Sequence, residues 1–443
     1  MDRIPLSFTQ QFICAYDQGD EEGPFGPRSH IVHGWRLHGE LDEQALRAAL
    51  ADVVVRHEAL RTQIVRDDGP PYQRVLPPGP VPIEVRDLSH VEPGRRDEAV
   101  DDLITEVESG TISSQRFPLI RGLLGRFGGA DHVLVLIVHH LAGDGWSVRL
   151  IIRDLAHFYA VRRGFDVGGL PAALPYREFV LRQRAAAADP AAERSRAYWR
   201  QALRGAKVFA VPTDHPKSAG LPESTAIHRF LVEEKTVTAV LEVARARRCT
   251  PFMVLLAAFM RLAHRMTGET DLVVPTFTSG RRGEDVQNTV GMFINILPIR
   301  VQLAGCRDFG ELADRVRNSC AEAYAHDMGR ILDEAPRLME PVLADTGAGC
   351  VFQVFPFPYL LHGNLVGDLE YTEVRRRLRS QPVGGEVPNG ELWTLNFDAA
   401  GDLVAAIQYN TNLFGEATIA AMVADYLDLL RASVLARETP LAW

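Results

Sequence analysis

The most distinct pattern of hydrophobic positions lies between residues 132 and 163. Residues 133–138 read Val-Leu-Val-Leu-Ile-Val, and six consecutive apolar residues of this kind predict a buried strand. Apolar side chains then recur at helical spacing from Trp146 to about Arg163, which predicts a helix with one buried face. The polar turn HHLAGDG, at 139–145, separates the two. Polar residues on a turn after a buried strand often line a functional cleft.

The first part of the chain predicts alternating helices and strands. A short helix opens it, with Ser7 as N-cap and Gln10 completing a capping box. A helix begins after Asp42, and another spans 98–109. Strands are predicted at 31–37, 63–65, 72–75 and 81–85, followed by a hairpin of 119–127 and 132–140. This order is typical of a mixed α/β fold around a central sheet.

Glycine, proline and alanine become frequent between about 164 and 190, which indicates a connecting region. We therefore predict an N-terminal lobe at 1–175 and a C-terminal lobe at 176–443. The second lobe has predicted helices at 192–203, 236–247, 251–266, 309–325 and 416–435, and strands at 227–232, 272–278, 293–303, 350–355, 392–397 and 403–409. Each lobe has the size of an ordinary domain, and two such lobes predict a cleft between them.

Composition narrows the class of protein. The chain has 443 residues, of which 46% are hydrophobic and 24% charged, as in ordinary globular proteins. A net charge of -9 argues against a nucleic-acid partner, because binding phosphates requires a basic face. The five cysteines have no metal-site or disulfide spacing. No leader or membrane-spanning stretch is evident, so we expect a soluble, cytoplasmic protein without a membrane partner.

The two histidines of the turn cannot both do chemistry at one point. Successive side chains of an extended chain face opposite ways, so only one of His139 and His140 faces a cleft. This weakens a metal site, since two ligands would have to converge. A histidine of near-neutral pKa can instead take a proton from an attacking amine or hydroxyl. Asp144 either orients the ring or pairs with an arginine, and the Gly145 amide is a candidate oxyanion donor. The alternative is structural, with Asp144 as a helix N-cap.

Six segments in order resemble the condensation domains of nonribosomal peptide synthetases, within the chloramphenicol acetyltransferase-like superfamily. The turn at 139–145 is similar to their HHxxxDG motif. Residues 56–62, RHEALRT, match their RHExLRT motif at every fixed position. The other four are LSFTQQ at 6–11, YREF at 176–179, VGMFIN at 290–295 and YNTNLF at 409–414. Several ordered matches are far more specific than any single motif.

The resemblance implies two acetyltransferase-like lobes in a V-shaped pseudo-dimer, with an active-site tunnel between them. It implies that His140 is catalytic and His139 structural. Asp144 would hold the turn through a salt bridge to Arg281, and Gly145 would line the tunnel. Trp146 and Asn295 are further candidates for the tunnel wall. The implied donor is a thioester on the phosphopantetheine arm of a peptidyl carrier protein, with no tightly bound cofactor and no metal.

The predicted function is therefore condensation of a carrier-bound acyl or aminoacyl group with an amine or alcohol in natural-product biosynthesis, including antibiotics. The acceptor is a small molecule or a second carrier-bound group, and we expect a free-standing enzyme. The alternatives are an acyl-CoA-dependent O- or N-acyltransferase and a non-catalytic recruitment module. The most basic run, 375–379, is interpreted as a solvated face, with contact to an acidic carrier protein or to a pantetheine phosphate as its alternative.

Overall fold

The structure is a computed structural model that describes residues 3–67, 69–190, 192–328, 331–334, 336–355, 361–375, 381–382, 390–398 and 400–435. The chain forms two compact units. The N-terminal unit comprises 1–188, 279–294 and 359–375, and the C-terminal unit comprises 189–278, 295–358 and 376–443. The division into lobes at 175 and 176 stays a prediction. Of the basic run at 375–379, only Arg375 lies within the described residues.

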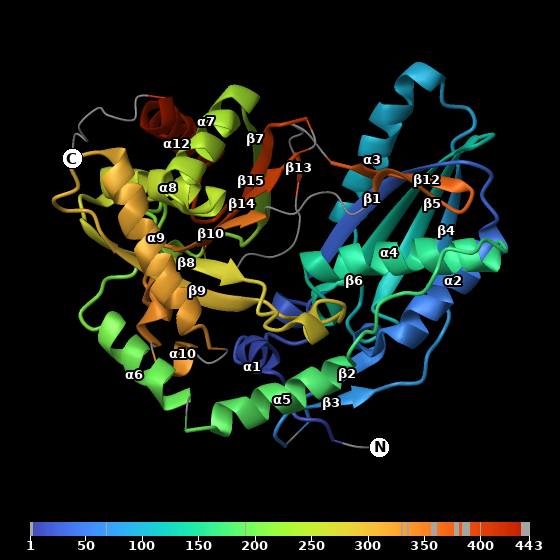
Figure 1. Cartoon of the computed structure of the whole chain (residues 1–443), viewed down its shortest axis with the longest axis horizontal. Coiled ribbons are helices and arrows are strands. Elements are labelled where there is room, and N and C mark those ends of the chain that lie inside the picture. The colour runs from blue at the N-terminus through green and yellow to red at the C-terminus, as the bar shows by residue number, and fades with distance from the viewer. Residues whose placement is uncertain are drawn as a thin grey trace. The chain divides into compact units, whose positions relative to one another are not determined.

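A six-stranded sheet forms the frame of the N-terminal unit (Figure 1), in the order β11-β12-β1-β6-β5-β4. Its neighbours are antiparallel except β4 and β5. The strands of this unit are β1 (His30–His38), β2 (Thr62–Val65), β3 (Tyr72–Val75), β4 (Ile83–Asp87), β5 (Ile120–Gly128), β6 (Asp131–His139), β11 (His362–Val366) and β12 (Leu369–Val374). The helices are α1 (Phe8–Cys14), α2 (Glu43–Arg56), α3 (Arg96–Ser109), α4 (Gly145–Arg162) and α5 (Tyr176–Ala188).

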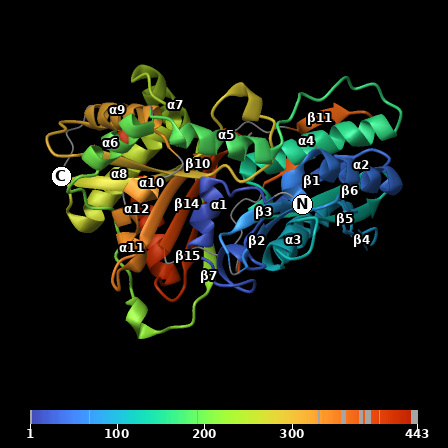
Figure 2. The same ribbon diagram turned by 90° about the horizontal axis from the view of Figure 1, so that it is seen from below.

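The two faces of this sheet are covered differently. Figure 2 shows α2 and α4 on one side and α3 on the other. Strand β6 is central and every one of its residues is buried, which is why its sequence is a continuous apolar run and not an alternating one. The strand ends at His139, and α4 starts at Gly145 behind the N-cap Asp144. The turn of interest is thus held between a buried strand and a buried helix.

Three side chains of the RHEALRT motif brace the end of α2. Arg56 Nε and His57 Nε2 both contact Asp154 Oδ2 of α4, at 2.8 Å and 2.7 Å. Arg61 Nε donates to the carbonyl oxygen of Val54 at 3.2 Å. Arg56 and His57 thus join the end of α2 to α4, and Arg61 ties the turn after α2 back to that helix, so these side chains serve the fold.

The C-terminal unit has a five-stranded sheet in the order β10-β14-β15-β7-β13, parallel only between β10 and β14. Its strands are β7 (Thr225–Val232), β8 (Asp271–Thr278), β9 (Asn295–Gln302), β10 (Gly349–Phe355), β13 (Gln381–Pro382), β14 (Gly390–Phe397) and β15 (Leu403–Asn410), with β8 and β9 paired separately. Its helices are α6 (Ala192–Ala202), α7 (Glu234–Ala246), α8 (Pro251–Thr267), α9 (Phe309–Ala325), α10 (Ile331–Glu334), α11 (Glu340–Leu343) and α12 (Glu416–Leu435). The mixed α/β class is confirmed.

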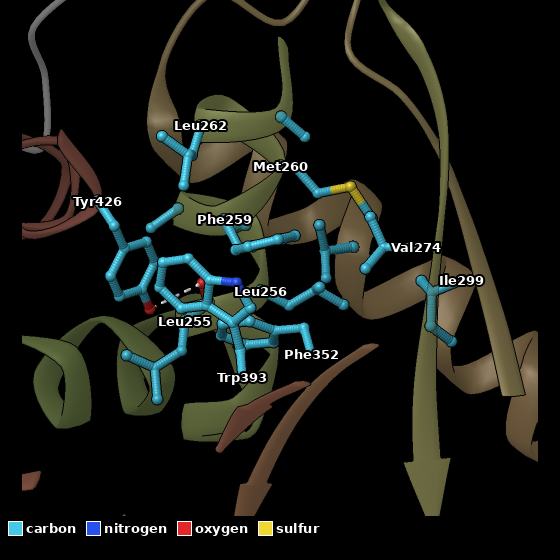
Figure 3. Close-up of a cluster of buried hydrophobic side chains, with 14 of the residues drawn as sticks. Leu255, Leu256, Phe259, Met260, Leu262, Val274, Ile299, Phe352, Trp393 and Tyr426 are labelled. Carbon is cyan, nitrogen blue, oxygen red and sulfur yellow. Dashed lines mark hydrogen bonds between the residues drawn. The ribbon is translucent and has the colours of Figure 1, made fainter. Parts of the chain in front are cut away.

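Helix α8 runs through the middle of the C-terminal core. It starts as its sequence predicts, with the N-cap Thr250 and Pro251 in the first turn, and it ends at Gly268, whose φ is +72°. Figure 3 shows Phe259 of this helix packed among the rings of Phe352, Trp393 and Tyr426. Within the described residues, no helix is long and apolar enough to cross a membrane.

Candidate active site

His139 is held as a neutral, internal histidine. Its side chain is fully buried, its Nδ1 accepts a hydrogen bond from the Leu141 amide at 3.2 Å, and its Nε2 lies 3.1 Å from the Gly26 carbonyl oxygen. Because one ring nitrogen must accept and the other must donate, this arrangement fits one neutral tautomer. Burial lowers the pKa of His139 to about 3. The ring therefore anchors the turn to the Gly26 carbonyl.

His140 begins the 3₁₀ turn η4 (His140–Ala142), and the residue is partly buried. Its backbone amide donates to the Ser29 carbonyl oxygen at 2.8 Å, which fixes the main chain at this residue. Among the described residues, His140 Nδ1 has no hydrogen-bond partner. Burial lowers the pKa of His140, and the Asp144 carboxylate opposes this only in part. The imidazole is consequently neutral at pH 7.

Asp144 is the N-cap of α4 and also a member of a buried ion pair. Its Oδ1 accepts from the Ser147 amide at 2.7 Å, which is the usual N-cap bond. Arg281 Nη2 lies 3.0 Å from Oδ1 and 3.2 Å from Oδ2. Arg281 Nη1 donates to the carbonyl oxygens of Val286, at 3.1 Å, and Thr289. Both side chains are buried, so the turn is fastened to 281–293 by charge-assisted bonds.

Ser147 was not identified from the sequence, yet its hydroxyl is the centre of this network. The oxygen lies 2.7 Å from Asp144 Oδ1, 3.0 Å from Arg281 Nη2 and 3.1 Å from the Gly291 amide nitrogen. It also lies 2.9 Å from the Gly291 carbonyl oxygen. The sequence signal that could have identified Ser147 is its position three residues after the N-cap Asp144, where the backbone amide bonds to the cap side chain.

The glycines of the turn have different surroundings. A Cβ on Gly143 would lie 2.8 Å from the Ser147 Cβ, so a side chain there would displace the turn. A Cβ on Gly145 would meet nothing within 4 Å, which shows open space beside this backbone. Gly145 is the first residue of α4, and within the described residues its N–H has no acceptor. An unpaired N–H at a helix start favours negative charge.

The structure brings some of the predicted site residues together and not others. Trp146 lies on α4 in the N-terminal unit, where its Nε1 donates to the Gln287 carbonyl oxygen at 2.9 Å. Asn295 is the first residue of β9 in the C-terminal unit. Its Nδ2 donates to Asp327 Oδ1 and to the Met328 carbonyl oxygen, the latter at 3.2 Å. The roles of Trp146 and Asn295 in a tunnel wall stay predictions.

Three of the family-like segments meet at one hydroxyl. The Tyr176 hydroxyl donates to the Met292 carbonyl oxygen at 2.6 Å and lies 3.0 Å from Ser7 Oγ. Gly291 packs against the same ring, so closely that a Cβ there would lie 2.1 Å from Tyr176 Cδ2. Ser7 belongs to the opening segment, Tyr176 to YREF and Gly291 to VGMFIN. Three motifs that are far apart in the sequence therefore contribute to one contact within the N-terminal unit.

The comparisons with known proteins agree with this site. The Condensation domain family model matches residues 2–442, and the chain belongs to this family. It is 32% identical over 440 residues to CymA, a probable nonribosomal peptide synthetase of Salinispora arenicola, and 30% identical over 442 residues to a linear gramicidin synthase of Brevibacillus parabrevis. It covers only 5% and 6% of those two proteins, although they match 97% of the chain. Condensation domains form amide bonds, and the chain is an acyltransferase of this type.

A much more similar chain is known among solved structures. The SgcC5 protein from Streptomyces globisporus is 44% identical, with a TM-score of 0.94, and the match covers 99% of this chain and 100% of that one. That crystal structure contains (R)-(-)-1-(2-naphthyl)-1,2-ethanediol and sucrose. The first condensation domain of the calcium-dependent antibiotic synthetase shares the fold at 21% identity and a TM-score of 0.76, covering 98% and 97% of the two chains.

Proposed function

We propose that this protein joins an acyl or aminoacyl group, carried as a thioester on the phosphopantetheine arm of a carrier protein, to a hydroxyl of a small aryl diol. The product is an ester, made in natural-product biosynthesis. The observation that carries the proposal is the neutral imidazole of the partly buried His140, whose Nδ1 has no partner among the described residues, on a turn that is held by hydrogen bonds at both ends. The family supplies the general reaction and the type of donor.

The choice of an alcohol acceptor is supported by the likeness to SgcC5, whose crystal structure holds an aryl 1,2-diol. Chemistry supports the same choice. A neutral amine attacks a thioester without prior loss of a proton, whereas an alcohol is a poor nucleophile until a base removes its proton. The lowered pKa of His140 keeps its lone pair free at pH 7 for this task.

The proposed reaction is an attack on the thioester assisted by a general base, followed by loss of the pantetheine thiol. The acceptor oxygen bonds to the thioester carbonyl carbon while its proton passes to His140. The carbonyl oxygen gains the negative charge, and the Gly145 amide, which has no acceptor among the described residues, is placed to donate to it. Collapse of this intermediate breaks the carbon–sulfur bond. The departing pantetheine thiolate takes the proton from His140, which returns the ring to its neutral form.

Asp144 and His139 act indirectly in this proposal. His139 holds the strand end through Gly26, and Asp144 holds the helix start through Arg281 and Ser147. Together they fix both ends of the turn, so the positions of His140 and Gly145 are set before substrate arrives. A preorganised site avoids rearrangement during the reaction, which is how fixed dipoles accelerate it.

The test is a reconstituted transfer reaction. The purified protein is incubated with a panel of acyl and aminoacyl carrier proteins and with 1-(2-naphthyl)-1,2-ethanediol, and product is measured by mass spectrometry. We expect ester from carrier-bound donor. His140→Ala should lower kcat for ester formation by about 10²–10⁴-fold, the range that general bases supply. For the matching amine, which has an amino group in place of the reacting hydroxyl, His140→Ala should lower kcat for amide formation by a smaller factor.

Three results would contradict the proposal. Product from acyl-CoA with none from any carrier would indicate the CoA-dependent alternative. Amide formation without detectable ester would overturn the acceptor. Undiminished ester formation by His140→Ala would overturn the mechanism. His157→Ala is the matched control, because this histidine of α4 lies outside the turn and should leave the reaction unchanged.

A further inference from the structure

A hollow of about 780 Å³ lies in the N-terminal unit, outside the turn described above. It is on the α3 side of the sheet, over β4 and β5, and Figure 2 shows α3 on this side. Helix α3 packs mainly on β1 and β6, and the hollow lies beside its C-terminal end, over the β4–β5 part of the face. The volume falls in the range of sites for small molecules, which is about 300–1,000 Å³.

The floor of the hollow is apolar. Leu123 of β5 and Val135 and Ile137 of β6 point to this face, and Val107 and Phe117 contribute to its lining. An apolar floor of this kind favours an aromatic or acyl body, because binding removes both surfaces from water. Within the sheet, Ile137 precedes His139 by two residues, so the hollow and the candidate active site use the same strand at separate points.

The charges around the hollow are unequally paired. Arg86 Nε lies 2.7 Å from Glu84 Oε1, and Arg86 Nη2 lies 2.7 Å from Glu106 Oε1, so these three groups satisfy one another. Arg121 and Arg116 also line the hollow, and neither makes an ion pair or hydrogen bond within the described residues. Arg121 is half-buried and sits opposite Ile137 in the sheet, on the same face. Three arginines against two glutamates leave a local positive charge on a chain whose net charge is -9.

We propose that this hollow is a binding site for an amphipathic carboxylate, with an aromatic or short acyl body on the apolar floor and the carboxylate on Arg121. The planar guanidinium matches a carboxylate through two parallel hydrogen bonds, and Arg116 at the rim adds attraction. The hollow involves neither the carrier nor the acceptor of the proposed function. The site can therefore be tested independently of that function.

Isothermal titration calorimetry with 4-phenylbutyrate tests the proposal on the full chain. The uncharged 4-phenylbutyramide is the matched ligand, and it should bind at least tenfold more weakly. Arg121→Met should raise the Kd for 4-phenylbutyrate by 10- to 100-fold, because it removes charge-assisted hydrogen bonds. Thr111→Trp, at an exposed position of the lining, should block binding of both ligands by filling the hollow.

Two controls separate this site from the rest of the molecule. Arg126→Met removes an exposed arginine of the same strand, paired with His132 on the opposite face, and should leave the Kd unchanged. His140→Ala should bind 4-phenylbutyrate normally. The proposal is overturned by equal binding of acid and amide, by an unchanged Kd in Arg121→Met or Thr111→Trp, or by loss of binding in His140→Ala. Circular dichroism and the melting temperature of each variant show whether it is folded.

Discussion

Among single residues, Asp144 combines two duties that are usually separate. It caps α4, and it is the anionic partner of an arginine with which it is buried. Arg281 also lies over the Phe293 ring, 3.9 Å from its centroid. Taking two charges out of water is costly, so the pair adds little net stability, but loss of one partner strands the other. The main effect of the Asp144–Arg281 pair is therefore to hold the turn in one conformation.

The burial of this ion pair predicts the outcome of a double-mutant cycle. Arg281→Met should lower the free energy of unfolding by about 3–5 kcal/mol, because it leaves the Asp144 carboxylate buried without its cation. Asp144→Asn should have a similar effect through the stranded guanidinium. The double variant should lose less free energy of unfolding than the sum of the losses in the two single variants. Urea unfolding measures all three, and strictly additive losses would contradict the coupling.

Between elements, α1, α5 and residues 279–294 meet at the Tyr176 hydroxyl. Tyr176→Phe removes this hydroxyl but keeps the ring under Gly291. We expect a loss of about 1–3 kcal/mol in the free energy of unfolding, since the Met292 carbonyl is left without its donor in a buried place. Tyr16→Phe is the control, because the Tyr16 hydroxyl makes no hydrogen bond within the described residues. Equal stability of the two variants would show that the junction depends on the ring alone.

A second junction joins a 3₁₀ turn to the end of a short helix in the C-terminal unit. Lys217 Nζ lies 2.9 Å from the Val342 carbonyl oxygen and 3.2 Å from that of Pro341, and it also contacts those of Ala344 and Gly347. An ammonium group fits such a set of carbonyls because its donors point in three directions, whereas a guanidinium is planar. This explains a lysine here in a chain whose cations are almost all arginine.

We therefore expect arginine to be a poor replacement at this position. Lys217→Arg and Lys217→Met should each lower the free energy of unfolding by about 1.5–3 kcal/mol, as for other hydrogen bonds to charged groups. Lys207→Met is the matched control, since the exposed Lys207 forms a surface ion pair with Glu269 and should change stability by less than about 1 kcal/mol. Chemical denaturation reports these differences. Full stability of Lys217→Arg would show that the directions of the ammonium donors do not matter at this junction.

Local patterns predicted the elements that hold the site, because each depends on nearby residues. The apolar run ending at His139, the N-cap Asp144 and the apolar face of α4 were all evident. Strands β11 and β12 were not predicted, although they extend the sheet next to β1. Strand β12 pairs with β1, more than three hundred residues away, and no local pattern encodes that contact. Among the described strands, β11 pairs only with the adjacent β12, so it joins the sheet through that strand. The hub role of Ser147 was missed for the same reason, since Gly291 and Arg281 are distant in the chain.

At the scale of the whole chain, each unit contains a buried titratable group, and burial shifts the pKa values of the two groups in opposite directions. In the N-terminal unit, burial lowers the pKa of His139 from 6.5 to about 3. In the C-terminal unit, burial raises the pKa of Glu391 from 4.5 to about 7, although Trp393 Nε1 donates to its Oε2 at 2.9 Å. Among the described residues, Glu391 Oε1 has no partner that would favour its charged form.

The sign of each effect follows from linkage. A lowered pKa in His139 means that the N-terminal unit has its full stability above pH 6.5 and loses up to about 5 kcal/mol as the pH falls to 3. A raised pKa in Glu391 means that the C-terminal unit has its full stability below pH 4.5 and loses up to about 3 kcal/mol as the pH rises through 7. The two units should therefore weaken at opposite ends of the pH range.

Peptide-resolved hydrogen exchange, corrected for intrinsic rates, tests this between pH 4 and 8. Protection of peptides from β6 should fall toward pH 4, and protection of peptides from β14 should fall toward pH 8. His139→Gln should flatten the first trend, since glutamine cannot be protonated in this range, and Glu391→Gln should flatten the second. Each substitution should leave the trend of the other unit in place. Parallel loss of protection in both units at one end of the range would show that other titrating groups dominate, and that these two buried side chains do not set the pH response.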